Sequence, residues 1–286
     1  MYEFDPWRSE LCTCGRKYSL NPYTGCAHAC IYCYITSYIP RAFSPRLKKG
    51  LLKRLRTELP KLSRSIPVTI ANSSDPYQPL EREHRQTLAC LKLLREFKVM
   101  LVTKGDLVQR DAHLIAGMQA AVAITITTLD ADTAAKLEPK APSPERRLRA
   151  LQVLAEHGIP TICRIDPVIP GINDDFRELV REVACAGVRH VTASTFKPRP
   201  DSWQRLCRVF PEQAERLREL YFTRGERVQN SRYLPAELRR RLMLELRREC
   251  MNRGMSFGAC REGLAMSMRS CDGMHLIRAG GARPGS

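Results

Sequence analysis

The sequence predicts an α/β protein organised as a partial (β/α)6 barrel, similar in plan to a TIM barrel, with an Arg-rich helical extension at its C-terminal end. Two observations predict this fold. Short runs rich in Val and Ile alternate with amphipathic stretches at intervals of roughly 25–35 residues, which favours parallel strands joined by right-handed helical crossovers. From about Pro198 onward this alternation gives way to helical periodicity.

Six strands are predicted, of which residues 66–71 have the clearest run rich in Val and Ile. They cover residues 17–24, 66–71, 98–103, 122–127, 161–165 and 190–194. The helices between them cover residues 46–59, 82–97, 107–118, 144–157 and 175–186. In folds of this kind ligands bind at the carboxyl ends of the strands, so we expect the functional residues in the loops that follow them.

The chain divides into four predicted regions. Residues 1–15 form a lead segment that contains a CxC pair, and residues 16–198 form the barrel. Residues 199–278 form the helical C-terminal region, with helices expected at 211–221 and 235–251. Residues 279–286 hold only Gly, Ala, Arg, Pro and Ser and are expected to be disordered.

The charge balance favours a polyanionic partner. The 286 residues carry a net charge of +17, which raises association rates with polyanions. Residues 201–286 contain 17 Arg and no Lys against 10 acidic residues, a net charge of 17 − 10 = +7. Arginine binds phosphate in a bidentate manner and stacks on bases. The alternative, that these arginines form solvated helix faces, remains open.

The composition also bears on location. No run of 18 apolar residues occurs, so we expect no membrane association. The N-terminal residues 1–7 lack the basic head and apolar run of a signal peptide, which predicts a cytoplasmic protein. Twelve cysteines in such a protein indicate metal ligation and buried thiols rather than disulfides.

Three cysteines lie in one short loop, where Cys26, Cys30 and Cys33 have the spacing CxxxCxxC with an aromatic residue before the third. Thiolates at this spacing can each hold one iron of a cubane [4Fe–4S] cluster and leave the fourth iron open, whereas electron-transfer clusters are usually closed by four cysteines. The small molecule that fits an open iron is S-adenosylmethionine (SAM), which one electron cleaves to a carbon radical. A zinc site that includes His28 is the alternative, although zinc sites usually pair CxxC knuckles.

This motif resembles the signature of the radical SAM superfamily. The surrounding sequence resembles its spore-photoproduct-lyase-like branch, often described as DNA repair photolyase-like, and the resemblance extends over residues 16–275. The matching segments are YSLNPYTGC at 18–26, SSDPYQPLE at 73–81, LVTK at 101–104, LEP at 137–139 and RIDPVIPGIND at 164–174. The resemblance implies a partial barrel, a [4Fe–4S] cluster on the three cysteines, and SAM as cosubstrate.

The resemblance also implies roles for residues near the cluster loop. Tyr32 is expected to pack near the adenine of SAM or to cover the cluster. Ser73, Ser74 and Asp75 are expected to contact the amino group of SAM, with the carboxylate pairing with the ammonium. The alternative for Asp75-Pro76 is a simple turn. Lys104 is expected to meet the SAM carboxylate or a substrate phosphate, unless it is a surface lysine.

Three further residues are assigned to the same pocket on the same basis. Glu138 is expected to bind a ribose hydroxyl, and Arg146 is expected to grip the carboxylate of SAM. The alternative for both is a structural ion pair. Asp166 ends a predicted strand and is expected to line the SAM or substrate pocket.

The remaining cysteines suggest two hypotheses. If the two ends of the chain meet in space, the CxC pair Cys12 and Cys14 could join Cys260 and Cys271 around a second cluster or a zinc ion. Cys163 lies inside a predicted strand, where it would donate a hydrogen atom in catalysis, as a thiol does in spore photoproduct lyase.

The resulting prediction is a radical SAM enzyme that cleaves SAM into methionine and a 5′-deoxyadenosyl radical. Its electron donor would be a flavodoxin or ferredoxin, and its favoured substrate is a nucleic acid, with lyase or repair-type chemistry. A radical SAM enzyme that modifies a protein, peptide or small metabolite is one alternative. A non-catalytic, metal-dependent nucleic-acid-binding protein is the other.

Overall fold

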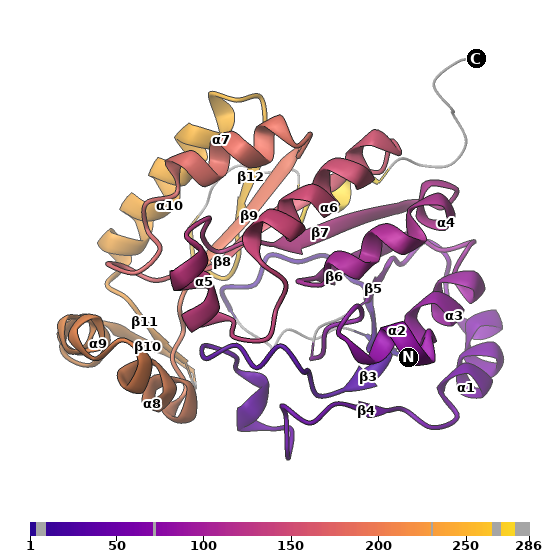
Figure 1. The fold of residues 1–286 in the computed structure, drawn as a ribbon, viewed down its shortest axis with the longest axis horizontal. Coiled ribbons are helices and arrows are strands. Elements are labelled where there is room, and N and C mark those ends of the chain that lie inside the picture. The colour runs from indigo at the N-terminus through magenta and orange to yellow at the C-terminus, as the bar shows by residue number, and fades with distance from the viewer. Residues whose placement is uncertain (4–9, 71–72, 230, 265–269, 278–286) are drawn as a thin grey trace.

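A mostly parallel sheet of eight strands forms the centre of the computed structural model, which describes residues 1–3, 10–70, 73–229, 231–264 and 270–277 (Figure 1). The strand order is β1-β2-β5-β6-β7-β8-β9-β12, and only β1 pairs antiparallel with its neighbour. The bounds are β1 Tyr2–Glu3, β2 Tyr18–Leu20, β5 Val68–Ile70, β6 Val99–Thr103, β7 Ala120–Thr125, β8 Thr161–Val168, β9 His190–Thr195 and β12 Ser256–Ala259.

The six predicted strands correspond to β2 and β5–β9, and the predicted α/β partial-barrel fold is confirmed. A seventh parallel strand comes from the C-terminal region, where only helices were expected. Strand β12 pairs with β9, with Phe257 opposite Val191. The sheet therefore continues into the chain beyond residue 198. Two short ribbons, β3 Tyr23–Thr24 with β4 Arg46–Leu47 and β10 Glu226–Val228 with β11 Ser231–Tyr233, lie outside it.

The helices lie around the outside of the sheet (Figure 1). The predicted helix at 82–97 is divided at Arg85, whose φ of 47° is incompatible with a continuous helix. Within the described ranges, no helix is long and apolar enough to cross a membrane. The bounds are α1 Leu51–Glu58, α2 Leu80–His84, α3 Gln86–Leu93, α4 Ala112–Ala116, α5 Ala131–Leu137, α6 Pro144–Glu156, α7 Arg177–Cys185, α8 Pro200–Val209, α9 Pro211–Arg218 and α10 Ala236–Met251.

Two of these helices were not predicted, and local capping explains both. Helix α5 begins after Asp130, whose side chain accepts a hydrogen bond from the backbone N–H of Thr133 at 2.7 Å. Helix α8 begins with Pro200, which is favourable at the first helical position. The hydroxyl of Ser202 accepts from the backbone N–H of Arg199 at 2.9 Å. The predicted tail at 279–286 lies outside the described residues.

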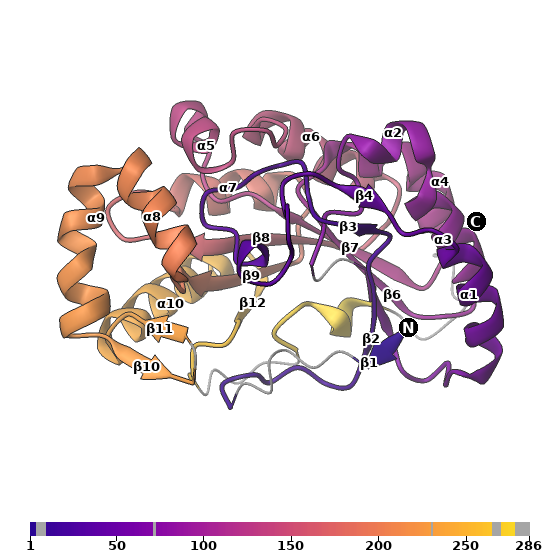
Figure 2. The same cartoon turned by 90° about the horizontal axis from the view of Figure 1, so that it is seen from below.

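The inner face of the sheet is covered by the C-terminal segment, which Figure 2 shows on the side opposite α6. A small apolar cluster joins Ile277 of this segment to Met100 and Ile162 of the sheet. The Thr192 hydroxyl donates to the backbone carbonyl of Cys271 at 2.9 Å. Because both faces are covered, all residues of β7 and β9 are buried.

The segment also approaches the sheet closely at Gly258. A Cβ atom there would lie 2.4 Å from the backbone oxygen of Cys271, closer than real Cβ contacts allow. We therefore predict that Gly258→Ala lowers the free energy of unfolding by about 3 kcal/mol, because backbone must move to admit the methyl group. Denaturant unfolding measures the change. Gly15→Ala is the control, because a Cβ there meets no atom within 4 Å, and equal effects at the two positions would contradict the packing described.

Candidate active site

A cavity of about 500 Å³ opens between the sheet, the cysteine loop and the two terminal segments. Its volume falls in the range of small-molecule sites. The cavity brings together most residues assigned from the sequence: Cys12, Cys14, Cys26, Cys30, Tyr32, Cys33, Ser73, Ser74, Asp75, Lys104, Asp166, Cys260 and Cys271.

The cysteine loop begins at a tight turn held by Gln78. Gly25 has a φ of +77°, and a Cβ atom there would meet the backbone oxygen of Ala42 at 2.6 Å, so only glycine fits. The fully buried Gln78 donates to the carbonyl of Gly25 at 3.2 Å and accepts from the N–H of Ala27 at 2.9 Å. One side chain therefore binds the backbone on both sides of Cys26.

The far end of the loop is held by Arg205 of helix α8. Its guanidinium donates to the carbonyls of Ile31 and Cys33, both at 2.8 Å, and to the hydroxyl of Thr36 at 3.0 Å. The backbone N–H of Ile31 also donates to the carbonyl of Leu137 at 2.9 Å. These bonds fix the loop against two separate helices.

The loop thiols are withdrawn from bulk solvent. Burial raises the pKa of Cys30 to about 12 and raises the pKa of Cys26 well above its ordinary value. Burial also raises the pKa of Cys33. Without a metal the three thiols are therefore protonated at neutral pH, and metal binding would displace their protons.

Asp75 links the ends of two strands to the cysteine loop. Its carboxylate accepts from the Thr103 hydroxyl and the Lys104 N–H, both at 2.6 Å, and from the Tyr77 N–H at 2.8 Å. His28 Nδ1 lies 3.4 Å from Asp75 Oδ2, the oxygen that also accepts from Lys104. Burial acts to raise the pKa of Asp75, but His28 and these donors outweigh it and lower the pKa.

Glu138 pairs with Arg147 instead of Arg146. Arg147 Nη1 lies 2.5 Å from the Glu138 carboxylate, and both side chains are almost fully buried. The Tyr32 hydroxyl and the Thr127 hydroxyl also donate to Glu138. Glu138 therefore positions Tyr32 from behind the cavity wall.

Glu138 also acts on Lys104. Burial alone would lower the pKa of Lys104, but Cys30 and Glu138 outweigh burial and raise this pKa.

The places of three residues do not fit the roles predicted for them. Glu138 is buried on Arg147 and does not line the cavity, so its carboxylate does not reach a ribose hydroxyl there. Arg146 does not line the cavity; it is more than half exposed and pairs with Asp106, its Nε lying 2.8 Å from the carboxylate. Cys163 is fully buried in the apolar core and does not line the cavity, so its thiol has no access to a substrate there. Asp166 lines the cavity and is held by Arg164 and Ser194, both at 2.5 Å.

The lead and C-terminal segments meet at the four remaining cavity cysteines. Cys14 Sγ lies 3.5 Å from Cys271 Sγ. Burial raises the pKa of Cys260, and the nearby charge of Arg164 acts in the opposite direction to lower it. In the part of the chain that the structure describes, no three His, Cys, Asp or Glu side chains are arranged to hold a single metal ion.

Two buried hydroxyls in the cavity wall lack partners. Thr69 Oγ1 and Ser74 Oγ make no hydrogen bond with any described residue, yet both residues line the cavity. Buried polar groups are normally satisfied, so these hydroxyls indicate a polar ligand.

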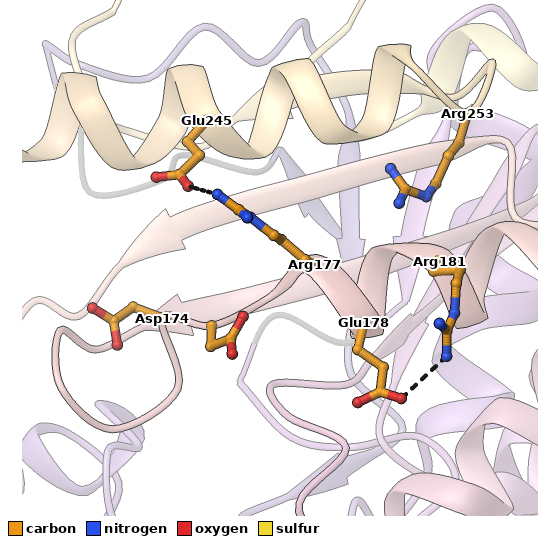
Figure 3. Close-up of a pocket in the computed structure, with 7 residues that line it drawn as sticks. Asp174, Arg177, Glu178, Arg181, Glu245 and Arg253 are labelled. Carbon is orange, nitrogen blue, oxygen red and sulfur yellow. Dashed lines mark hydrogen bonds and ion pairs between the residues drawn. The ribbon is translucent and has the colours of Figure 1, made fainter.

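A second hollow of about 740 Å³ lies between α7 and α10, and Figure 3 shows the side chains that line it. Its arginines are paired: Arg177 lies 3.3 Å from Glu245, Arg181 lies 3.1 Å from Glu178, and Arg253 pairs with Glu249 outside the hollow. None of the site residues assigned above lines it, so we do not place the active site there.

Three residues that shape the site were not found by sequence reasoning: Gln78, Arg147 and Arg205. Gln78 stands inside the SSDPYQPLE segment, so its position in that motif was a usable signal. Arg147 is adjacent to Arg146, and only the direction of each side chain on α6 distinguishes them. Nothing in the local sequence around Arg205 marks it.

The fold and cavity together define the class of α/β proteins in which a cavity lies at the carboxyl ends of parallel strands, where such folds bind their ligands. More particularly, the chain belongs to the radical SAM superfamily, whose family model matches residues 20–183. Members of this superfamily carry a [4Fe–4S] cluster, use SAM and require an electron donor.

Three relatives show how far this similarity extends. An uncharacterised protein of Methanocaldococcus jannaschii is 32% identical over 166 residues, which cover 56% of this chain and 63% of that protein. An uncharacterised protein of Mycobacterium tuberculosis is 29% identical over 79% of this chain and 71% of its own length. The radical SAM Nalpha-GlyT isomerase of Pseudomonas phage M6 is 25% identical, covering 70% of this chain and 45% of that enzyme.

Two solved structures share the fold. A spore photoproduct lyase mutant with bound AdoMet and dinucleoside spore photoproduct matches with a TM-score of 0.62 at 18% identity, over 86% of this chain and 75% of that one. SuiB of Streptococcus suis, bound to its precursor peptide, matches with a TM-score of 0.58 at 14% identity, over 85% of this chain and 48% of that one.

The contacts of Arg205 generate a prediction for the cysteine loop. We expect Arg205→Ala to speed loss of iron from reconstituted protein by about tenfold, because the variant lacks charged donors to two loop carbonyls. Iron release to a chelator under anaerobic conditions measures the rate. Arg208→Ala, an exposed change on the same helix, is the control. An unchanged rate in the Arg205 variant would show that the loop does not depend on α8.

Proposed function

We propose that this chain cleaves SAM reductively at a [4Fe–4S] cluster bound by Cys26, Cys30 and Cys33, and that its substrate is a nucleic acid. The observation that carries the proposal is the cavity itself, which is lined both by these three cysteines and by Thr69 and Ser74 with their unpartnered hydroxyls. Reduction of SAM at such a cluster supplies a 5′-deoxyadenosyl radical, and the protein provides binding and orientation.

The chain's own residues fit both cofactors. The three cysteines leave one iron of a cubane without a protein ligand. The hydroxyls of Thr69 and Ser74 are placed to bond a polar group, and Lys104 provides a cation beside the Tyr32 ring, with Nζ 5.4 Å from the ring centroid. Asp75 already accepts from three donors, so we assign it to holding the cavity wall and the cysteine loop rather than to binding the ammonium alone.

The cavity wall favours an anionic substrate. Its six cationic residues outnumber its three acidic ones. The cations are Lys17, Lys104, Arg164, Lys197, Arg199 and Arg261, and the acids are Asp75, Asp166 and Asp272. Such an excess of positive charge in a cleft attracts phosphate groups.

Two aromatic side chains add a second reason to propose a nucleic acid. Tyr34 and Tyr38 line the cavity and are 42% and 41% exposed, with ring centroids 6.2 Å apart. Exposed aromatic faces beside cationic groups bind single-stranded nucleic acid by stacking on its bases. The spore photoproduct lyase structure that shares this fold contains a bound dinucleoside spore photoproduct. On that basis we propose lyase or repair-type chemistry for this chain. We propose a flavodoxin or ferredoxin as its electron donor.

Reconstitution with iron and sulfide under anaerobic conditions tests the cofactor part of the proposal. We expect the reduced wild-type protein to convert SAM to 5′-deoxyadenosine and methionine, measured by liquid chromatography. Cys33→Ala should abolish this activity, because it removes one of three iron ligands, whereas the exposed Cys185→Ala should not. Nucleic-acid binding without SAM cleavage would instead identify a metal-dependent binding protein.

A separate measurement tests the substrate class. We expect Tyr38→Ala to weaken binding of a labelled single-stranded oligonucleotide by about tenfold, equivalent to about 1.4 kcal/mol of lost stacking. Fluorescence anisotropy at two salt concentrations gives the affinity and its salt dependence. Phe222→Ala is the control, because this ring is similarly exposed but does not line the cavity. Salt-independent binding, or affinity for acidic peptides alone, would favour a peptide substrate.

A further inference from the structure

Arg261 lines the cavity, and most of its guanidinium donors are unpaired. Its Nη2 donates to the Tyr233 hydroxyl at 3.5 Å, and its buried Nε has no partner among the described residues. Three other cations of the cavity wall already have carboxylate partners, which are Asp272 for Lys17, Asp166 for Arg164 and Glu262 for Lys197. Because buried donors are normally satisfied, Arg261 indicates an anionic ligand that the described residues do not supply.

The backbone of Arg261 is strained. Its φ of 56° lies in the left-handed region, where glycine is the relaxed choice and a long side chain is unfavourable. Such strain persists only where the surrounding structure enforces it, and it is concentrated at active sites and ligand clamps. An arginine at this position therefore needs a reason other than backbone preference.

Contacts on both sides of Arg261 enforce this conformation. The Cys260 N–H donates to the carbonyl of Ala193 at 2.8 Å. On the other side, the fully buried Glu262 carboxylate accepts from the Thr195 N–H and from Lys197 Nζ, both at 2.7 Å. The two neighbours of Arg261 are thus fixed to the end of β9 and the residues that follow it, and Arg261 is held at the cavity wall between them.

The place of Arg261 in the sheet separates it from the residues that we assign to SAM. Ser74 follows β5 and Lys104 follows β6, whereas Arg261 follows β12, the edge strand. Strands β7, β8 and β9 lie between β6 and β12, and neighbouring strands are about 4.8 Å apart. Arg261 therefore lines a different part of the cavity, where the substrate has room to bind.

We propose that Arg261 binds a phosphate group of the nucleic-acid substrate. The inference rests on the proposed function and deepens it, because it names the residue and the sheet edge at which the polyanion is held. A phosphate accepts from two adjacent guanidinium donors at once, so it would satisfy the donors that Arg261 leaves unpaired.

The salt dependence of oligonucleotide binding tests this assignment. We expect Arg261→Gln to bind a labelled single-stranded oligonucleotide about tenfold more weakly than wild type, because a charge-assisted contact is lost. The slope of log K against log salt concentration should also fall by about 0.7, the contribution of one phosphate contact in a single strand. Fluorescence anisotropy over a salt series measures both quantities.

Two further variants separate charge from geometry. Arg261→Lys keeps the charge and should keep the slope, but it should bind more weakly than wild type because the planar fork is lost. Arg240→Gln is the matched control, since it removes the same charge from an exposed position on α10 that does not line the cavity. It should change neither the affinity nor the slope.

Arg261→Gly tests whether the residue is retained for binding instead of stability. This variant should bind as weakly as Arg261→Gln yet unfold at a higher denaturant concentration than wild type, because glycine relieves the left-handed strain. A lower unfolding midpoint together with the weaker binding would assign Arg261 to the fold and overturn the phosphate site.

The remaining outcomes distinguish this site from the proposed function. If wild type binds the oligonucleotide and Arg261→Gln binds it with the same affinity and slope, the phosphate site is rejected and the proposed function stands. Wild-type protein that binds an acidic peptide but no oligonucleotide would reject the nucleic-acid substrate and this site together.

Discussion

The sheet is the constraint on which the rest of the structure depends, because its parallel strands must be covered on two faces. Helices cover the outer face, as crossover connections require. The inner face is covered by the C-terminal segment, which lies irregularly over β9 and β12. Irregular segments cannot fill the space above a sheet as regularly as a helix does. The space left beside the cysteine loop is the cavity that we assign to SAM and substrate.

Two buried carboxylates hold the segments around the cavity in place. Asp75 and Glu138 are both almost fully buried, where an unpaired carboxylate would be strongly unfavourable. Each is satisfied by several donors from different elements, so each joins segments that are distant in sequence. Loss of Arg147 would leave the Glu138 charge buried and unpaired, an arrangement that typically costs about 3–5 kcal/mol. Asp75 and Glu138 therefore stabilise the structure around the cysteine loop, in addition to lying near the proposed ligand site.

The fold was largely predictable because the strands alternate with amphipathic helices at regular intervals along the chain. Strand β12 was missed because Ser256–Ala259 is short and contains glycine, so its sequence does not resemble a buried strand. The cysteine loop was predictable because its chemistry depends on local spacing. The residues that hold the loop in place were harder to predict, because they lie far from it in sequence. Gln78 is 53 positions from Gly25, and Arg205 is 174 positions from Ile31. Arg146 forms the structural ion pair that was the alternative for it, with Asp106, because its side chain on α6 points away from the cavity.

The bond between Arg205 and the cysteine loop also has a consequence for biosynthesis. A ribosome releases the chain from its N-terminus, so residues 26–33 emerge long before helix α8 exists. Until then the carbonyls of Ile31 and Cys33 lack their guanidinium partner and the loop has one fewer restraint. The loop therefore gains this restraint only after residues 200–209 have been synthesised and α8 has docked.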